Sequence, residues 1–326
     1  MYFKLAAAGL TLLAALAVPD RASHAQAWPT KPVKVIVPFA AGGSTDRVGR
    51  VVADELSKTF KQQFYVENRV GGGGAVGARE IVRVEPDGYT LLIGGFGPLI
   101  LGPAAGPLGY DPIGDFTHVA MIAGESYVFA AHASTGLKTI ADLTAMLKSR
   151  SQPVNVGSPG VGTLGQLMVE QFRLRDEMKL LNHVPYRGGG AQMTTDLLGG
   201  HVPLAMSPIA LVTEHIKAGT VIALAASSDK RMPILPNVPT FREAGYEEVG
   251  GAIWFWVAGP KNLPEPIVSQ LNKEVRRIIG SPEIQAQFNR DALLSADLDA
   301  PALNRFVASE LKRWSTLIEK AGLKKN

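Results

Sequence analysis

Hydrophobic positions along the chain follow two periods, and each change from one to the other marks a strand that leads into a helix. Val33–Val37 is rich in β-branched residues and predicts a short buried strand, whereas Val48, Val52 and Leu56 recur at helical spacing. The same succession predicts further strands at 63–67, 90–93, 119–123, 128–131, 154–156, 202–206, 221–226 and 253–257. It predicts helices at 75–84, 140–149, 164–174, 211–218, 266–279 and 301–321, and one that ends at 198.

This alternation predicts an α/β fold with parallel-rich sheets, in which ligands bind at the carboxyl ends of the strands. The chain has 326 residues, more than one hydrophobic core usually serves, so we expect two α/β domains. We expect residues 28–130 and 250–326 to form the first domain and residues 131–249 the second. The strand at 128–131 would cross into the second domain, and the strand at 253–257 would return.

The first 27 residues are predicted to be a signal peptide rather than part of the fold. Lys4 precedes the apolar run Leu5–Val18, and Ala25-Gln26-Ala27 is a small-x-small cleavage site. The apolar run is too short to span a bilayer. We therefore expect a soluble, exported protein that begins at Trp28. The chain has no cysteine, which excludes disulfides and thiolate metal ligands and is common in the bacterial periplasm.

The net charge of +4 is mild and the basic residues are scattered, so the sequence gives no nucleic-acid footprint. The basic pair Lys312-Arg313 and the tail 324–326 read as solvated surface. The six histidines include no pair at the spacing of a helical zinc site. We expect surface or loop positions, rather than metal ligation, for His118, His132, His183, His201 and His215. We predict no metal, no cofactor and no catalytic residue.

The loop after the first strand is the leading candidate site. Gly42-Gly43 permits a tight turn with the backbone close to a ligand, and Ser44, Thr45 and Asp46 are residue types that begin helices. Free backbone N–H groups would converge there at the positive end of a helix dipole, which suits a carboxylate or phosphate. An ordinary strand–helix turn that binds nothing is the alternative.

A second strand, glycine loop and helix of the same chemistry follows about 115 residues later, as the numbering shows. Two such loops facing each other across a cleft could hold both ends of a small acid. The predicted ligand-binding residues are Phe39, Ala41, Gly42, Gly43, Ser44, Thr45, Asp46, Gly95, Phe96, Ser158, Gly162, Thr163, Gln166 and Ser207.

Three enzyme or nucleotide readings compete with this one. Gly72, Gly74 and Gly77 match the dinucleotide pattern G-x-G-x-x-G, but the next strand ends without the acidic residue that such a site needs. The residues around Ser158 fail the G-x-S-x-G pattern of serine hydrolases. Asp46 could be a general base of an enzyme that acts on a small carboxylate, or simply an acid favoured by the helix dipole.

An ordered set of short motifs covers essentially the whole chain after residue 27. These are VPFAAGGSTD at 37–46, VENR at 66–69, PDGYTLL at 86–92, YDP at 110–112, VPYRG at 184–188, DLLGG at 196–200, IKAG at 216–219 and LPNVPT at 235–240. In this order they resemble the Bug family, the periplasmic substrate-binding components of tripartite tricarboxylate transporters.

The resemblance implies a type II periplasmic-binding fold, with two α/β domains around a ligand cleft and crossing hinge strands. It implies capture of a small organic carboxylate by the loops 39–46 and 158–163, largely through backbone amides and bridging water. It also implies delivery to membrane components of the transporter, by a protein expected to be a monomer. The chain departs from the family pattern at Leu164-Gly165-Gln166, at Gly102-Pro103 and at Trp256.

Overall fold

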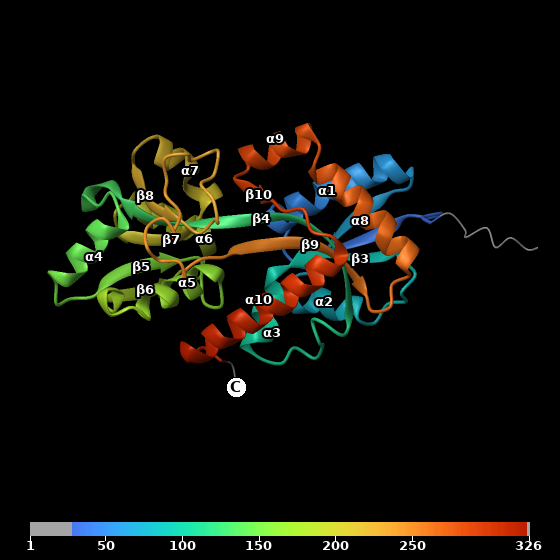
Figure 1. Cartoon of the computed structure of the whole chain (residues 1–326), viewed down its shortest axis with the longest axis horizontal. Coiled ribbons are helices and arrows are strands. Elements are labelled where there is room, and N and C mark those ends of the chain that lie inside the picture. The colour runs from blue at the N-terminus through green and yellow to red at the C-terminus, as the bar shows by residue number, and fades with distance from the viewer. Residues whose placement is uncertain (1–27, 325–326) are drawn as a thin grey trace, which may run out of the picture.

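The protein, described here from a computed structural model, is elongated and has two lobes (Figure 1). The structure describes residues 28–324, so the predicted signal peptide and its cleavage site lie outside the described residues. Two α/β lobes share one continuous ten-stranded sheet, with the order β2-β1-β3-β9-β4-β7-β5-β6, in which β10 and β8 also pair with β4.

The first lobe is built on three parallel strands and one antiparallel strand. These are β1 (Val33–Val37), β2 (Phe64–Asn68), β3 (Thr90–Gly95) and β9 (Ala252–Pro260), and β9 runs antiparallel to β3. The helices α1 (Ser44–Phe60), α8 (Glu265–Ile279) and α9 (Pro282–Arg290) lie on one side of this sheet, and α2 (Ala75–Ile81), α3 (Gly102–Ala105) and α10 (Ala300–Lys320) lie on the other (Figure 1).

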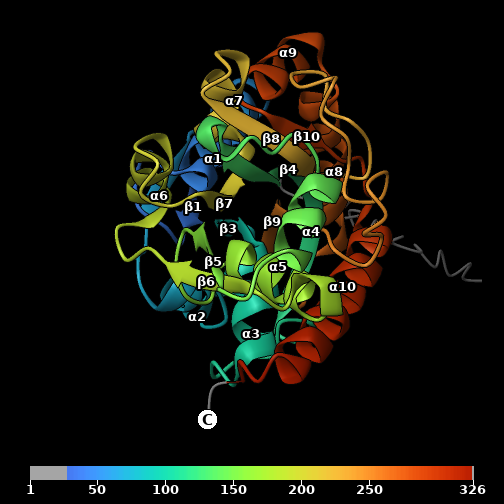
Figure 2. The same ribbon diagram turned by 90° about the vertical axis from the view of Figure 1, so that its left-hand side faces the viewer.

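The second lobe repeats the plan. Strands β5 (Val154–Ser158), β6 (Leu181–Pro185) and β7 (Leu204–Pro208) are parallel, and β8 (Val221–Ala226) lies against β4. The helices are α4 (Ile140–Lys148), α5 (Leu164–Arg173), α6 (Gly189–Leu198) and α7 (Ile209–Lys217). Figure 2 looks onto the end of this lobe and shows its helices around the strands.

Strand β4 (Phe116–His132) joins the lobes. It pairs with β9 up to Ser126 and with β7 from Tyr127 onward, so its two halves belong to different lobes. The two separate strands predicted at 119–123 and 128–131 are one strand. The polar residues between them stay extended because β9 and the short β10 (Leu293–Ser295) pair with them on both edges. We propose that the lobes divide here, close to the predicted boundary at residue 130.

The chain returns to the first lobe through Gly250 and Gly251, which have φ of 157° and 142° and lie beside the β4 crossing. Ser227 links the two crossings, because its Oγ accepts from the Tyr127 amide at 2.9 Å and donates to the Gly251 carbonyl at 2.6 Å. Both connections between the lobes are therefore tied together at one level of the molecule.

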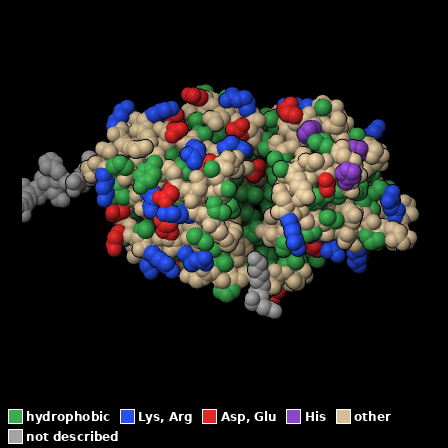
Figure 3. Space-filling model, turned by 180° about the vertical axis from the view of Figure 1, so that it is seen from behind, with side chains coloured by type: hydrophobic (Ala, Val, Ile, Leu, Met, Phe, Trp, Pro, Cys, Tyr) green, Lys and Arg blue, Asp and Glu red, His purple; other side chains and the backbone are tan. Residues whose placement is uncertain are grey.

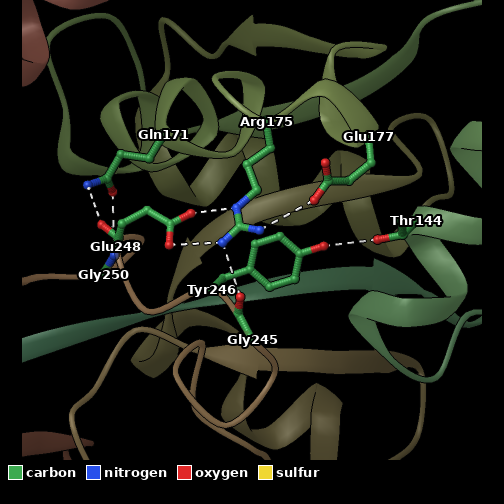
Figure 4. Close-up of polar contacts among 8 residues, drawn as sticks. All are labelled: Thr144, Gln171, Arg175, Glu177, Gly245, Tyr246, Glu248 and Gly250. Carbon is green, nitrogen blue, oxygen red and sulfur yellow. Dashed lines mark hydrogen bonds and ion pairs between the residues drawn. The ribbon is translucent and has the colours of Figure 1, made fainter.

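A cluster of polar contacts binds residues 245–250, which lead back to the first lobe, to the second lobe (Figure 4). Arg175 donates to both carboxylate oxygens of Glu248, at 2.5 and 2.9 Å, and its guanidinium lies 4.7 Å from the ring centroid of Tyr246. Gln171 donates to the Glu248 carbonyl and accepts from the Gly250 amide. The hydrogen bonds from Arg175 lower the pKa of Glu248. These contacts attach the segment to the second lobe as far as Gly250, whose carbonyl accepts from Arg313 of α10 in the first lobe.

Besides β10 and a few single helical turns, three segments are regular in the structure but not in the sequence prediction. Strand β6 is a short edge strand in which Asn182 is exposed and His183 is half-buried. Helix α9 begins at a Ser-Pro-Glu start, with Ser281 as its cap. Residues 96–105, for which the sequence predicts no helix or strand, are helical because Leu99 and Ile100 are buried in the first lobe's core.

Candidate functional site

A cleft of about 390 Å³ lies between the lobes. Figure 3 shows it as a groove with hydrophobic side chains along its floor. Its lining residues come from both lobes and from both crossings: Phe39, Ser44, Thr45, Gly73, Gly94, Phe96, Gly97, Leu101, Glu125, Tyr127, Val161, Gly162, Thr163, Leu164, Ile253 and Phe255. The carboxyl ends of β1, β3 and β5 therefore meet at one site, as the α/β alternation predicts.

The first glycine loop is held in shape by the helix it precedes. Gly42 has a φ of 83°, which favours glycine, and its N–H donates to Oδ2 of Asp46 at 2.9 Å. Helix α1 begins two residues later, at Ser44, and the amides of its first turn lack helical acceptors. Within residues 28–324, the amides of Ser44 and Thr45 have no protein acceptor. These N–H groups are free to bind an anion at the rim of the cleft.

The carboxylate of Asp46 holds this loop in place through several hydrogen bonds. Its carboxylate also accepts from Arg50, at 2.9 and 3.0 Å, and from Asn68 at 2.9 Å. Burial alone would raise the pKa of Asp46, but the hydrogen bonds from Arg50, Gly42 and Asn68 lower it to about 2. A carboxylate with this low pKa and four protein donors is a poor proton acceptor, so the geometry opposes the general-base interpretation of Asp46.

Asp46→Asn should therefore weaken the loop rather than abolish a reaction. Because the pKa of Asp46 is lower in the folded protein, its stabilisation is present above about pH 4 and is lost as pH falls toward 2. We expect the unfolding free energy at pH 7 to fall by about 2 kcal/mol. Urea titration at several pH values measures this. Asp54→Asn, an exposed acid on the same helix, is the control, and equal losses in both variants would contradict the bracing role.

The second glycine loop repeats this arrangement. Gly162 has a φ of 73°, and its N–H donates to Oε1 of Gln166 at 2.7 Å, again four residues ahead. Thr163 caps α5, accepting from the Gln166 amide at 3.4 Å and donating to the Gly160 carbonyl at 2.8 Å. In both lobes a glycine, held by a side chain in the first turn of a helix, presents that turn to the cleft. We call this pair of interactions the glycine latches: Gly42 with Asp46 and Gly162 with Gln166.

The floor of the cleft carries one acidic side chain, Glu125 of β4. It is 5% exposed, and its Oε1 accepts from the Ser44 hydroxyl at 3.2 Å. Burial raises the pKa of Glu125, partly offset by the Ser44 hydrogen bond and the charge of Arg47. Tyr127, two residues along the same face, is buried beside it, and burial likewise raises the pKa of its phenol.

The structure brings some of the predicted site residues to the cleft lining and leaves others outside it. Those in the lining are Phe39, Ser44, Thr45, Phe96, Gly162 and Thr163. Those outside the lining are Ala41, Gly42, Gly43, Asp46, Gly95, Ser158, Gln166 and Ser207. Asp46 and Gln166 shape the loops, while Ser158 bonds to the ring of His183 at 2.6 Å and Ser207 donates to the Pro208 carbonyl.

Sequence reasoning missed the contributions of the two crossings, namely Glu125 and Tyr127 of β4 and Ile253 and Phe255 of β9. A period-two pattern exists at these positions, but it does not say which face meets a cleft. Ile253 and Phe255 face this cleft, whereas Ala252 and Trp254 line a separate cavity of about 370 Å³ on the opposite face of the crossing.

The expectation that the five histidines after residue 27 lie on the surface or in loops is wrong for His118. Its side chain is fully buried on β4, where Nδ1 accepts from the Trp256 indole at 2.9 Å and Nε2 bonds to the Pro112 carbonyl at 2.9 Å. Within residues 28–324, no group of three or more histidine or acidic side chains is arranged to hold a metal ion.

Comparison with known proteins places this geometry in a family. Residues 48–323 match the family described as tripartite tricarboxylate transporter family receptor. BugT of Bordetella pertussis is 32% identical over 302 residues, which is 92% of this chain and 92% of that protein. A protein named for an intergenic region of Agrobacterium vitis is 34% identical over 95% of this chain and 90% of its own length.

Solved structures are similar over the same extent. An R. palustris protein with adipate has a TM-score of 0.78 and 32% identity, covering 90% of this chain and 98% of that chain. The periplasmic binding protein BugD has a TM-score of 0.74 and 30% identity, covering 92% and 100%. MatC from Rhodopseudomonas palustris with bound malate has a TM-score of 0.74 and 29% identity, covering 89% and 100%. In the part of this chain that the structure describes, no helix is long and apolar enough to cross a membrane.

Proposed function

The chain belongs to the tripartite tricarboxylate transporter receptor family, and on that premise we propose that it captures a small organic carboxylate in the periplasm and delivers it to the membrane components of such a transporter. The relatives solved with adipate and with malate support this class of ligand. We propose that the mature protein begins at Trp28, binds its ligand as a monomer, uses no cofactor and performs no chemistry.

One observation carries the proposal: two helices begin at the same cleft, one from each lobe, and residues of each first turn line it. We propose that the amides of Ser44 and Thr45 hold one carboxylate and that those of Thr163 and Leu164 hold the other end of the ligand. The remaining predicted residues would act indirectly. Asp46 and Gln166 hold the loops, while Phe39 and Phe96 form the walls.

Closure of the lobes is part of the proposed mechanism. Micromolar affinity corresponds to about −8 kcal/mol, and hydrogen bonds to a charged group contribute roughly 1.5–3 kcal/mol each. A few amide donors reach that value only where water is excluded, so the open cleft must close over the ligand. The crossings at Ser126–Tyr127 and Gly250–Gly251 are the positions at which we expect the lobes to rotate.

A ligand panel tests the proposal. We expect one or more mono-, di- or tricarboxylates to raise the melting temperature and to bind at one-to-one stoichiometry in calorimetry, because a ligand that binds only the folded state stabilises it by mass action. The corresponding amides and methyl esters, which lack the negative charge, should have no effect. Steady turnover of a carboxylate, lost in Asp46→Asn, would support the enzyme alternative instead.

A further inference from the structure

The chemistry of the cleft lining is unusual for a site that binds an anion. Among the described residues that line it there is no lysine, arginine or histidine, while Glu125 supplies an acid. Four of its other lining side chains are aromatic: Phe39, Phe96, Tyr127 and Phe255. An acid together with aromatic rings, and without a base, is the environment that proteins offer to a cation.

Glu125 has no positive partner within the described part of the chain. The Ser44 hydroxyl is its hydrogen-bond donor, and it takes part in no ion pair between described residues. Arg47, the basic side chain whose charge acts on it, is exposed and donates instead to the Gly42 carbonyl at 3.1 Å. Arg50 is held by Asp46. Among the described residues, this buried acidic group is therefore compensated only by one hydroxyl donor and by the charge of an exposed arginine, which is less than buried carboxylates normally have.

A ligand whose only charged groups are carboxylates would add a second negative charge beside Glu125. Ser44 contributes both a free amide at the start of α1 and the hydroxyl bound to Glu125, so an anion on that amide lies close to the acid. The carboxylate of the ligand and that of Glu125 would then be neighbours and would repel each other in a site of low dielectric. A positive group on the ligand, placed between its own carboxylate and Glu125, removes the repulsion and supplies the missing partner.

We propose, on the basis of the function proposed above, that the ligand is an ammonium carboxylate. Its carboxylate binds the free amides at the start of α1, and its ammonium group binds Glu125 among the aromatic side chains of the cleft. Glu125 then determines specificity, because it accepts from the cationic group of the correct ligand and repels a plain carboxylate of the same shape.

Matched ligand pairs test this on the unaltered protein. Each pair differs only in the ammonium group: 5-aminopentanoate against pentanoate, and glutamate against glutarate. A further pair is trimethylammonioacetate against 3,3-dimethylbutanoate, in which a carbon atom replaces the positively charged nitrogen. Calorimetry at pH 7 should show the ammonium member of at least one pair binding about tenfold or more tightly than its partner, the discrimination expected for a buried charge pair.

Glu125→Gln separates charge from shape. The amide keeps the size of the side chain and a hydrogen-bonding oxygen but removes the negative charge. We expect binding of the preferred ammonium ligand to weaken by about tenfold to a hundredfold, while its plain partner binds equally or more tightly. Glu170→Gln, an acid on α5 that pairs with Arg173 away from the cleft, should change neither affinity. Circular dichroism and melting curves confirm that each variant is folded.

The outcomes distinguish this inference from the function on which it rests. If plain carboxylates bind as tightly as their ammonium partners, or if Glu125→Gln weakens both members of a pair equally, the inference is overturned while the carboxylate receptor stands. If no carboxylate of either kind binds the unaltered protein, the proposed function itself is overturned. The wild-type comparison remains decisive should Glu125→Gln fail to fold.

Discussion

Gly95→Ala is expected to destabilise the protein by about 3–5 kcal/mol, because it combines backbone strain with overpacking. Gly95 ends β3 with a φ of 126°, a conformation that L residues rarely adopt. A methyl group there would lie 2.3 Å from the Trp254 carbonyl oxygen and 2.5 Å from the Trp256 ring. These neighbours belong to β9 and are fixed by the sheet, so the strands would have to separate.

Urea denaturation at pH 7 measures this effect. Gly73→Ala is the matched control, because Gly73 also has positive φ, at 66°, but a methyl group there meets no atom within 4 Å. We expect the control to lose about 1–2 kcal/mol, the cost of a left-handed backbone alone. If the two variants lose similar amounts, the close packing of β3 against β9 is not the source of the strain. The predicted contact of Gly95 with ligand stays a prediction, separate from this structural role.

Acidification from pH 6.5 to 4 is expected to remove about 3 kcal/mol of stability through His118. Burial lowers the pKa of His118 to about 4, against the opposing hydrogen bond to Pro112. The unfolded chain therefore binds a proton at a higher pH than the folded protein does. The stabilisation is complete above about pH 6.5 and is lost as pH falls toward 4, and His183, whose pKa burial also lowers, acts in the same direction.

Chemical denaturation at half-unit pH intervals measures how the unfolding free energy changes with pH. His118→Gln cannot titrate, so its unfolding free energy should be lower at pH 7 but should change less between pH 6.5 and 4. His201→Gln, on the exposed surface, serves as the control and should keep the wild-type slope. A wild-type slope in His118→Gln would assign the acid sensitivity to other groups.

Local signals in the sequence were enough for the glycine loops and for most helices. A β-branched run, a glycine pair and hydroxyl residues before an amphipathic helix lie within fifteen residues or so, and no distant part of the chain is needed to interpret them. The two glycine latches are also local, because Gly42 and Asp46, like Gly162 and Gln166, are only four residues apart.

The floor of the cleft depends instead on distant pairings. Gly124-Glu125-Ser126 interrupts two apolar runs and reads as a break between strands, yet it is buried because residues 252–254 and 293–295 pair with it. Similarly, His118 is buried against Trp256, which lies 138 residues away in the sequence. Such burial of polar side chains is decided by tertiary packing, so neither composition nor periodicity could have assigned it.

The glycine latches have a kinetic consequence. Because Gly42 and Gly162 are already held by their own helices, a ligand that reaches the open cleft finds both sets of amides in their binding geometry. Encounter then needs no reordering of a loop, and related acids should share nearly the same association rate constant. Differences in affinity among them would arise in the dissociation rate constant, which depends on how often the closed lobes reopen. How long an acid stays bound, rather than how fast it is captured, would then decide which one reaches the membrane.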